Sequence, residues 1–165
     1  WMLGSSADSA LLAAQRGLPY NLAAFINPQA DPALIQYYKE RFQPSELQQQ
    51  PYAILTMSVF CADTAERAAE LAHTHDINFF RFVTGQAGEV SLTPEEAAEF
   101  PMTPQLQSFI QDRSRLRATG TVVQVKEKIT QLAELFSADE IMAVTNMHYF
   151  EDRKRSFELL KVAFN

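Results

Sequence analysis

The sequence predicts an α/β fold, a partial TIM barrel of about four βα units that correspond to strands five to eight. Short apolar runs rich in strand-forming residues alternate with amphipathic stretches along most of the chain. Gly, Pro and Asp residues separate these runs where helices are expected to start or stop. The length of 165 residues, of which 47% are hydrophobic, suits one domain (1–165) with a sizeable core.

The N-terminal part of the chain contains two predicted units. A strand at 1–4 precedes a helix over about residues 6–16, which stops at Gly17, a common residue just after a helix. After an apolar segment at 20–26, Asp31 supplies an N-cap acceptor and the following proline needs no amide partner. The second helix has an apolar face formed by Leu34, Ile35, Tyr38 and Phe42.

The third predicted strand is the apolar run at 52–60. Asp63 and Glu66 have the spacing of a capping box, which predicts a helix from there to about His73. Residues 76–119 are predicted to be an insertion with partial helix, because they combine a helix start at 93–96 with several breakers: Gly85, Gly88, Pro101 and Pro104.

The fourth predicted unit follows this insertion. It begins with a helix that carries an apolar side made of Val122, Val125, Ile129, Leu132 and Phe136. A strand at 140–145 comes next, and a final helix starts at about Phe150. In that helix we expect three side chains to point inward: Phe157, Leu160 and Phe164. Four parallel strands would leave open sheet edges and an apolar wall, so we expect the strands to pair with another polypeptide or the sheet to close in a smaller arrangement.

Composition excludes several classes of protein. The formal net charge of −6 argues against nucleic acid or an anionic membrane as partner. No apolar run approaches the roughly 20 residues of a membrane span, and the start lacks the pattern of a secretory signal. Cys61 is the single cysteine, which fits a reducing compartment. We therefore expect a cytoplasmic protein.

The turn after the first strand is the strongest candidate site. Gly4, Ser5 and Ser6 lie between strand and helix, and Ser9 follows one turn later. First-turn amides lack helical partners and favour an anion, serine hydroxyls add donors, and glycine lets a phosphate approach. The alternative is that Ser5 or Ser6 only caps the helix.

Other polar groups carry weaker hypotheses. His73 and His75 lack the supporting cluster of a zinc site, and Cys61 is expected to be a buried thiol. His148 follows the fourth strand, where it either faces a ligand or caps the last helix together with Tyr149. Arg113, Arg115 and Arg117 form a basic cluster that either contacts a phosphorylated ligand or, as we expect, is surface charge. The paired acids Glu95–Glu96 and Asp139–Glu140 are expected to be caps or surface charges.

Five segments in this order resemble the bacterial luciferase-like flavin-dependent monooxygenases. They are LGSSADSALLAAQRGLP, PALIQYYKERFQPS after an apolar strand, PYAILTMSVFCADTAERAAELA, GTVVQVKEKITQLAELFSADEIMAVT and RKRSFELL, and together they leave about residues 76–118 unmatched. The resemblance implies the second half of a TIM barrel that uses reduced FMN and oxygen. It does not include the first half, which in the family supplies much of the flavin-ring cavity and the substrate pocket.

The resemblance also implies roles for individual residues. The serine-containing turn of the family helps to hold the flavin phosphate, and its counterparts here are Gly4, Ser5, Ser6 and Ser9. Ala24 ends the next strand, where family members often carry an aromatic residue or His that lines the cavity. Without the first half, we expect the chain to be inactive alone.

The match to only the second half of a barrel also implies partners for this chain. We expect a first-half barrel chain or a homo-oligomer, and a flavin reductase is a further candidate. Two other hypotheses stay open: a non-catalytic half-barrel that associates with itself, and a module that binds phosphate ligands without preferring flavin.

Overall fold

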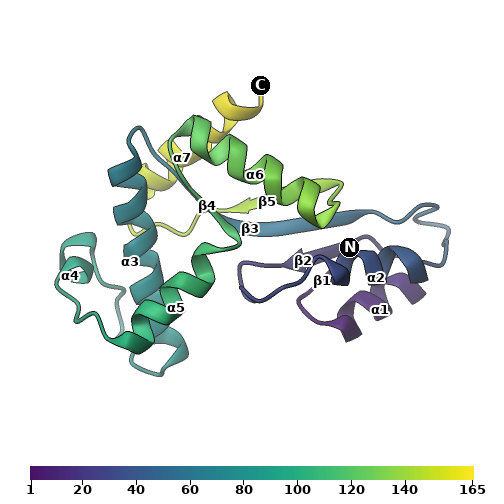
Figure 1. Ribbon diagram of the computed structural model, residues 1–165, viewed down its shortest axis with the longest axis horizontal. Helices are drawn as coiled ribbons and strands as arrows, with labels where there is room; N and C mark the ends of the chain where they lie inside the picture. The colour runs from purple at the N-terminus through teal and green to yellow at the C-terminus, as the bar shows by residue number, and fades with distance from the viewer. The chain divides into compact units, whose positions relative to one another are not determined.

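The computed structural model describes all residues, 1–165, as parallel strands alternating with helices (Figure 1). Two compact units are described separately below: residues 1–58 with 129–144, and residues 59–128 with 145–165. In chain order the elements are β1 (Met2–Gly4), α1 (Ala7–Gln15), β2 (Tyr20–Ala23), α2 (Ala33–Arg41), β3 (Ala53–Cys61), α3 (Ala65–Val83), α4 (Pro94–Ala98), α5 (Pro104–Ser114), β4 (Arg117–Gly120), α6 (Val122–Phe136), β5 (Glu140–Val144) and α7 (Phe150–Phe164). The prediction of an α/β fold with a parallel sheet is confirmed.

The first unit contains a parallel sheet in the order β1, β2, β3 and β5. In its register Met2 lies opposite Tyr20, and Tyr20 lies opposite Ala53. Helices α1 and α2 lie side by side (Figure 1). The α1 face toward the core consists of alanines, which allow close packing: Ala10, Ala13 and Ala14, all fully buried.

Two buried tyrosines stabilise this unit. The Tyr20 and Tyr38 rings are 5.5 Å apart between centroids. The Tyr38 hydroxyl donates to the Leu18 carbonyl at 3.0 Å and accepts from the Tyr52 amide at 3.0 Å. Asp31 Oδ1 accepts from the Ala33 amide at 2.7 Å, as predicted, although the N-cap of α2 is Pro32, one residue later than expected.

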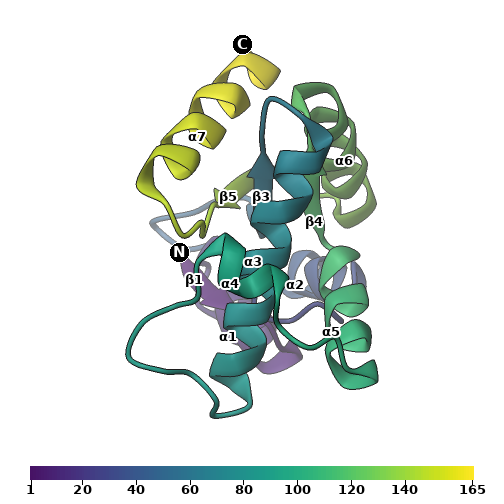
Figure 2. The ribbon, with the colours of Figure 1, turned by 90° about the vertical axis from the view of Figure 1, so that its left-hand side faces the viewer.

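In the second unit, α4 and α5 both contact α3 (Figure 2). The short strand β4 follows β3 in the strand order, and the Ala62 amide donates to the Gly120 carbonyl at 3.1 Å. The sequence did not predict β4. One buried cluster comprises Phe60, Ala62, Ala68, Leu71, Ala72 and Met147, and another comprises Ile77, Phe80, Ala97 and Leu106.

The predicted start and end of α3 are both wrong. Thr64 is the N-cap, and its hydroxyl accepts from the Arg67 amide at 3.2 Å, whereas Asp63 pairs with Arg155. The helix continues past His73 to Val83, so the first residues of the predicted insertion are helical. The rest of that region contains α4, α5 and β4.

The inward face predicted for α7 is also wrong. Phe157 and Phe164 are 48% and 52% exposed, while the buried residues are Ser156, Leu159 and Ala163. The reason is a hydrogen bond from the Cys61 amide to Ser156 Oγ at 3.1 Å, which turns the serine side of the helix inward. No helix in the chain is both long enough and apolar enough to span a membrane.

Candidate functional site

The turn between β1 and α1 brings four predicted site residues together in the first unit. Ser6 is the N-cap of α1 and forms a reciprocal capping box with Ser9. Ser9 Oγ accepts from the Ser6 amide at 3.2 Å and donates to the Ser6 carbonyl at 2.7 Å, and Ser6 Oγ accepts from the Ser9 amide at 3.4 Å. The capping role that the sequence left open is therefore real.

Gly4 is required by the tight packing of this turn. A Cβ at Gly4 would stand 2.2 Å from Ser9 Oγ, closer than atoms can approach. The Tyr20 hydroxyl donates to the Gly4 carbonyl at 3.3 Å and lies 3.4 Å from Ser9 Oγ. Burial raises the pKa of Tyr20, so its hydroxyl keeps its proton at neutral pH. The Tyr20 hydroxyl thus contacts both Gly4 and Ser9 and stabilises the turn. The sequence did not indicate that Tyr20 belongs to this site.

The loop after β2 lies against the same turn. Ala24 is buried, and its amide donates to the Leu22 carbonyl at 3.0 Å. Asn27 Nδ2 donates to the Ser5 carbonyl at 3.2 Å. Because β1 and β2 are parallel neighbours, their carboxyl ends meet at one edge of the sheet, which is where barrel enzymes build their sites. The first-turn amides of α1 open at this edge.

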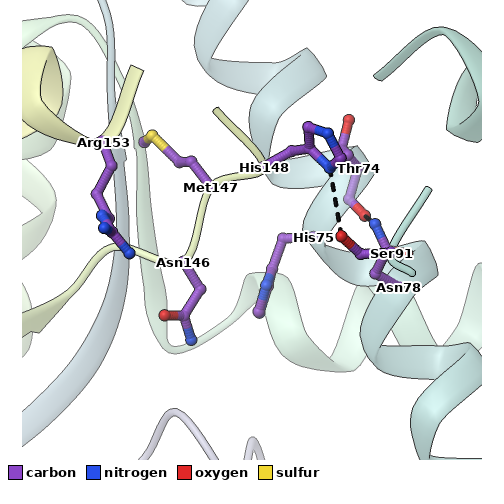
Figure 3. Close-up of a pocket in the computed structure, with 8 residues that line it drawn as sticks. All are labelled: Thr74, His75, Asn78, Ser91, Asn146, Met147, His148 and Arg153. Carbon is purple, nitrogen blue, oxygen red and sulfur yellow. Dashed lines mark hydrogen bonds between the residues drawn. The ribbon is translucent and has the colours of Figure 1, made fainter. Parts of the chain in front are cut away.

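The second unit contains a separate polar cavity of about 200 Å³. Figure 3 shows its lining side chains, which come from α3, the loop before α4, and the segment from the end of β5 into α7: Thr74, His75, Asn78, Ser91, Asn146, Met147, His148 and Arg153. His148 Nδ1 and Ser91 Oγ are hydrogen-bonded at 3.3 Å, which links the loop after β5 to the loop before α4. His148 therefore lines a cavity, and its contact with a ligand stays a prediction.

His75 is neutral at physiological pH in this cavity. Burial, together with the neighbouring Arg113 and Arg117 charges, lowers the pKa of His75 to about 4. Arg113 Nη2 lies 3.3 Å from His75 Nε2, and since a guanidinium can only donate, this ring nitrogen accepts. The remaining nitrogen, Nδ1, then carries the proton.

Arg113 and Arg117 are not surface charges, contrary to the sequence prediction. Both pair with Asp76, a fully buried carboxylate on α3: Arg113 through Nε at 3.4 Å, and Arg117 through Nη1. Arg113 also lies over the Phe79 ring, with its guanidinium carbon 4.1 Å from the centroid. Asp76 thus ties α5 and β4 to α3, a role that no local pattern around it indicated.

The other candidate residues are buried or make hydrogen bonds that stabilise the fold. Cys61 is buried, and burial raises the pKa of its thiol. Asp139 accepts from the Ala53 amide at 2.8 Å, and Glu140 accepts from the Tyr52 hydroxyl at 2.9 Å. Glu96 completes the capping box of α4. No group of three or more His, Cys, Asp or Glu side chains is arranged to hold a metal ion.

Comparison with known sequences finds relatives along almost the whole chain. The Bacillus subtilis protein YwcH is 40% identical over 167 residues, which cover 99% of this chain and 49% of YwcH. A luciferase-like monooxygenase of Escherichia coli is 29% identical over 159 residues, which cover 96% of this chain and 47% of that protein. No family model matches the sequence. The chain spans about half the length of the curated relatives it matches.

Solved structures agree with this relationship. The crystal structure of apo-MsnO8 has a TM-score of 0.87 at 31% identity, covering 99% of this chain and 50% of that one. The oxygenating constituent of 3,6-diketocamphane monooxygenase from Pseudomonas putida, solved in complex with FMN, shares the fold with a TM-score of 0.62 at 20% identity; the match covers 96% of this chain and 45% of that one. By sequence, this chain is similar to luciferase-like monooxygenases, and by sequence and fold it matches about half the length of the proteins to which it is similar.

Proposed function

We propose that this chain forms the C-terminal half of a luciferase-like, FMN-dependent monooxygenase barrel, and that the turn from Gly4 to Ser9 binds the flavin phosphate. The observation that carries the proposal is the built turn at the carboxyl end of β1, in a chain related to flavin enzymes. Reduced FMN would supply the electrons for activating oxygen.

The residues of the turn divide into two groups. The amides of Ala7 and Asp8 have no partner within the helix, and the Ser5 hydroxyl is an additional donor, so these groups would contact the phosphate oxygens. The Ser6 hydroxyl donates to Ser9 Oγ at 3.4 Å and caps the helix. Ser9 uses its proton on the Ser6 carbonyl and therefore supports the turn. Ala24 would contribute a small, close-packed part of the cavity wall at the next strand end.

A second polypeptide would complete the sheet. In the first unit β1 has only β2 as a neighbour, and Leu3 on this edge strand is 45% exposed, while Trp1, just before it, is 63% exposed. An open edge with exposed apolar side chains favours strand pairing. The partner is a first-half barrel chain, or a second copy of this chain in the alternative of a non-catalytic, self-associating half-barrel.

Flavin binding tests the cofactor assignment. FMN and riboflavin, which lacks the phosphate, are titrated by flavin fluorescence against this chain, alone and with the part of YwcH that it does not match. FMN should bind more tightly than riboflavin. Ser6→Asp should weaken FMN binding by about tenfold or more, since it adds a negative charge, and should leave riboflavin binding unchanged.

The matched control is Ser6→Asn. Asparagine caps a helix about as well as aspartate but carries no charge, so it should retain most of the FMN affinity. If FMN bound equally well to Ser6→Asp and Ser6→Asn, the assignment of the phosphate site to this turn would be wrong. Sedimentation of the chain tests the partner: a monomer that does not bind the apolar dye ANS contradicts an incomplete half-barrel.

A further inference from the structure

We infer that the cavity between α3 and the loop after β5 binds a carboxylate group of a small organic acid. Under the proposed function this acid is the substrate, and only that link depends on the proposed function. The cavity is lined only by residues of the second unit, whereas Gly4–Ser9 belongs to the first unit, and the cavity can be tested without flavin.

The charge of the lining favours an anion. Its eight residues include one arginine and two histidines but no Asp or Glu, in a chain that has 20 acidic residues and a net charge of −6. Arg153 makes no ion pair, whereas the next two cations on α7, Lys154 and Arg155, pair with Glu151 and Glu158. Arg153 therefore retains its capacity for a bidentate contact with a carboxylate.

Uncharged hydrogen-bond donors also line the cavity. His75 has Nδ1–H left as a donor because its other ring nitrogen accepts from Arg113. Asn146 lies two residues after β5, lines the same cavity, and carries an amide that can donate (Figure 3). One permanent positive charge with neutral donors suits a singly charged carboxylate better than a phosphate dianion.

The wall of the cavity is held in place by hydrogen bonds. Asn78 on α3 holds the loop before α4 at Leu92, with Nδ2 donating to the Leu92 carbonyl at 3.0 Å and Oδ1 accepting from its amide at 2.7 Å. Ser91 then bonds to His148. A site that is already formed loses little freedom when a ligand binds.

The volume and the apolar lining of the cavity indicate which group the carboxylate is attached to. A cavity of about 150 Å³ is enough to hold benzene, and this one is about 200 Å³. Met147, a buried residue, supplies an apolar and adaptable surface. A carboxylate on a ring or on a short aliphatic chain fits both properties.

Histidine NMR during titration with benzoate tests the inference. Ring Hε1 signals of His75 and His148 should shift and saturate in the millimolar range, while His73, which does not line the cavity, stays unchanged. Arg153→Gln should weaken binding by about tenfold or more. Lys154→Gln makes the same charge change one residue along the helix, outside the cavity, and should leave binding unchanged.

Two further probes identify the ligand group. Benzyl alcohol keeps the ring without the charge, and inorganic phosphate keeps an anion without the ring. Shifts of equal size with benzyl alcohol, tighter binding of phosphate than of benzoate, or equal benzoate affinity in Arg153→Gln would each overturn the carboxylate site. Arg153→Gln should weaken benzoate binding without altering FMN affinity, whereas Ser6→Asp should weaken FMN binding without altering benzoate affinity. Failure of the carboxylate site can therefore be distinguished from failure of the flavin phosphate site.

Discussion

Ser9 Oγ occupies space beside Gly4 that a Cβ on residue 4 would enter, at a distance of only 2.2 Å. The same hydroxyl bonds to the Ser6 amide and carbonyl, so the turn closes only if residue 4 has no side chain. The capping box of α1 is thus packed directly against the end of β1, at the site proposed for the flavin phosphate.

Gly4→Ala should destabilise the protein by about 1–3 kcal/mol, because overpacking forces Ser9 away from Ser6. Urea unfolding measures this change. Gly88→Ala is the control, since the nearest atom to its added Cβ is Arg81 Nη2 at 3.5 Å, an ordinary contact. The control should stay within about 0.5 kcal/mol of the parent. Equal effects of the two substitutions would contradict the crowding at Gly4.

Ser156→Ala should cost about 1–3 kcal/mol, because it leaves the buried Cys61 amide without an acceptor. Faster hydrogen exchange of that amide should accompany the loss. Ser114→Ala removes an exposed hydroxyl that bonds only to the Gln111 carbonyl, and it should have little effect. A Cys61 amide that stays equally protected in both variants would mean that Ser156 does not anchor α7.

Asp76→Asn should destabilise by about 3–5 kcal/mol, since Arg113 and Arg117 lose the negative charge of their buried partner. Asp63→Asn breaks an exposed pair with Arg155, which solvent screens, and should have a much smaller effect. Both variants are compared by urea unfolding. Similar losses in the two would show that burial of Asp76 does not decide its contribution.

Stability should fall as pH drops from 6.5 toward 4. The folded-state pKa of His75, about 4, lies below the ordinary value of 6.5, so protons bind more readily to the unfolded chain. The contribution is complete above pH 6.5 and is lost by pH 4, a change of about 3 kcal/mol. His75→Gln should flatten this part of the profile. Titration of the His75 Hε1 signal provides the direct check, and a midpoint above pH 6 would falsify the prediction.

The local pattern was sufficient where one segment determines its own structure. Asp31 before a proline predicted the start of α2, and the apolar run at 52–60 predicted β3 to within one residue at each end. Ser6 was weighed as a helix cap from its residue type alone, and it is one. Caps and strands depend on neighbours along the chain, and those are visible in sequence.

Side-chain orientation in α7 was not predictable in this way. Apolar size favoured Phe157 and Phe164 as the inward residues, but the Cys61 amide, far away in sequence, selects the Ser156 side. The same holds for Arg113, whose burial depends on Asp76 in another helix. A helix with apolar residues on two sides has no single inward face until its partner is known.

Local sequence patterns predicted the alternation of strands and helices, the serine turn after β1, and a resemblance to luciferase-like monooxygenases. It took the folded chain to show that His75, Asn146, His148 and Arg153 line one cavity without an acid among them. Strand and cap formation are governed by energies within a few residues, whereas a cavity is made by segments that only the folded chain brings together.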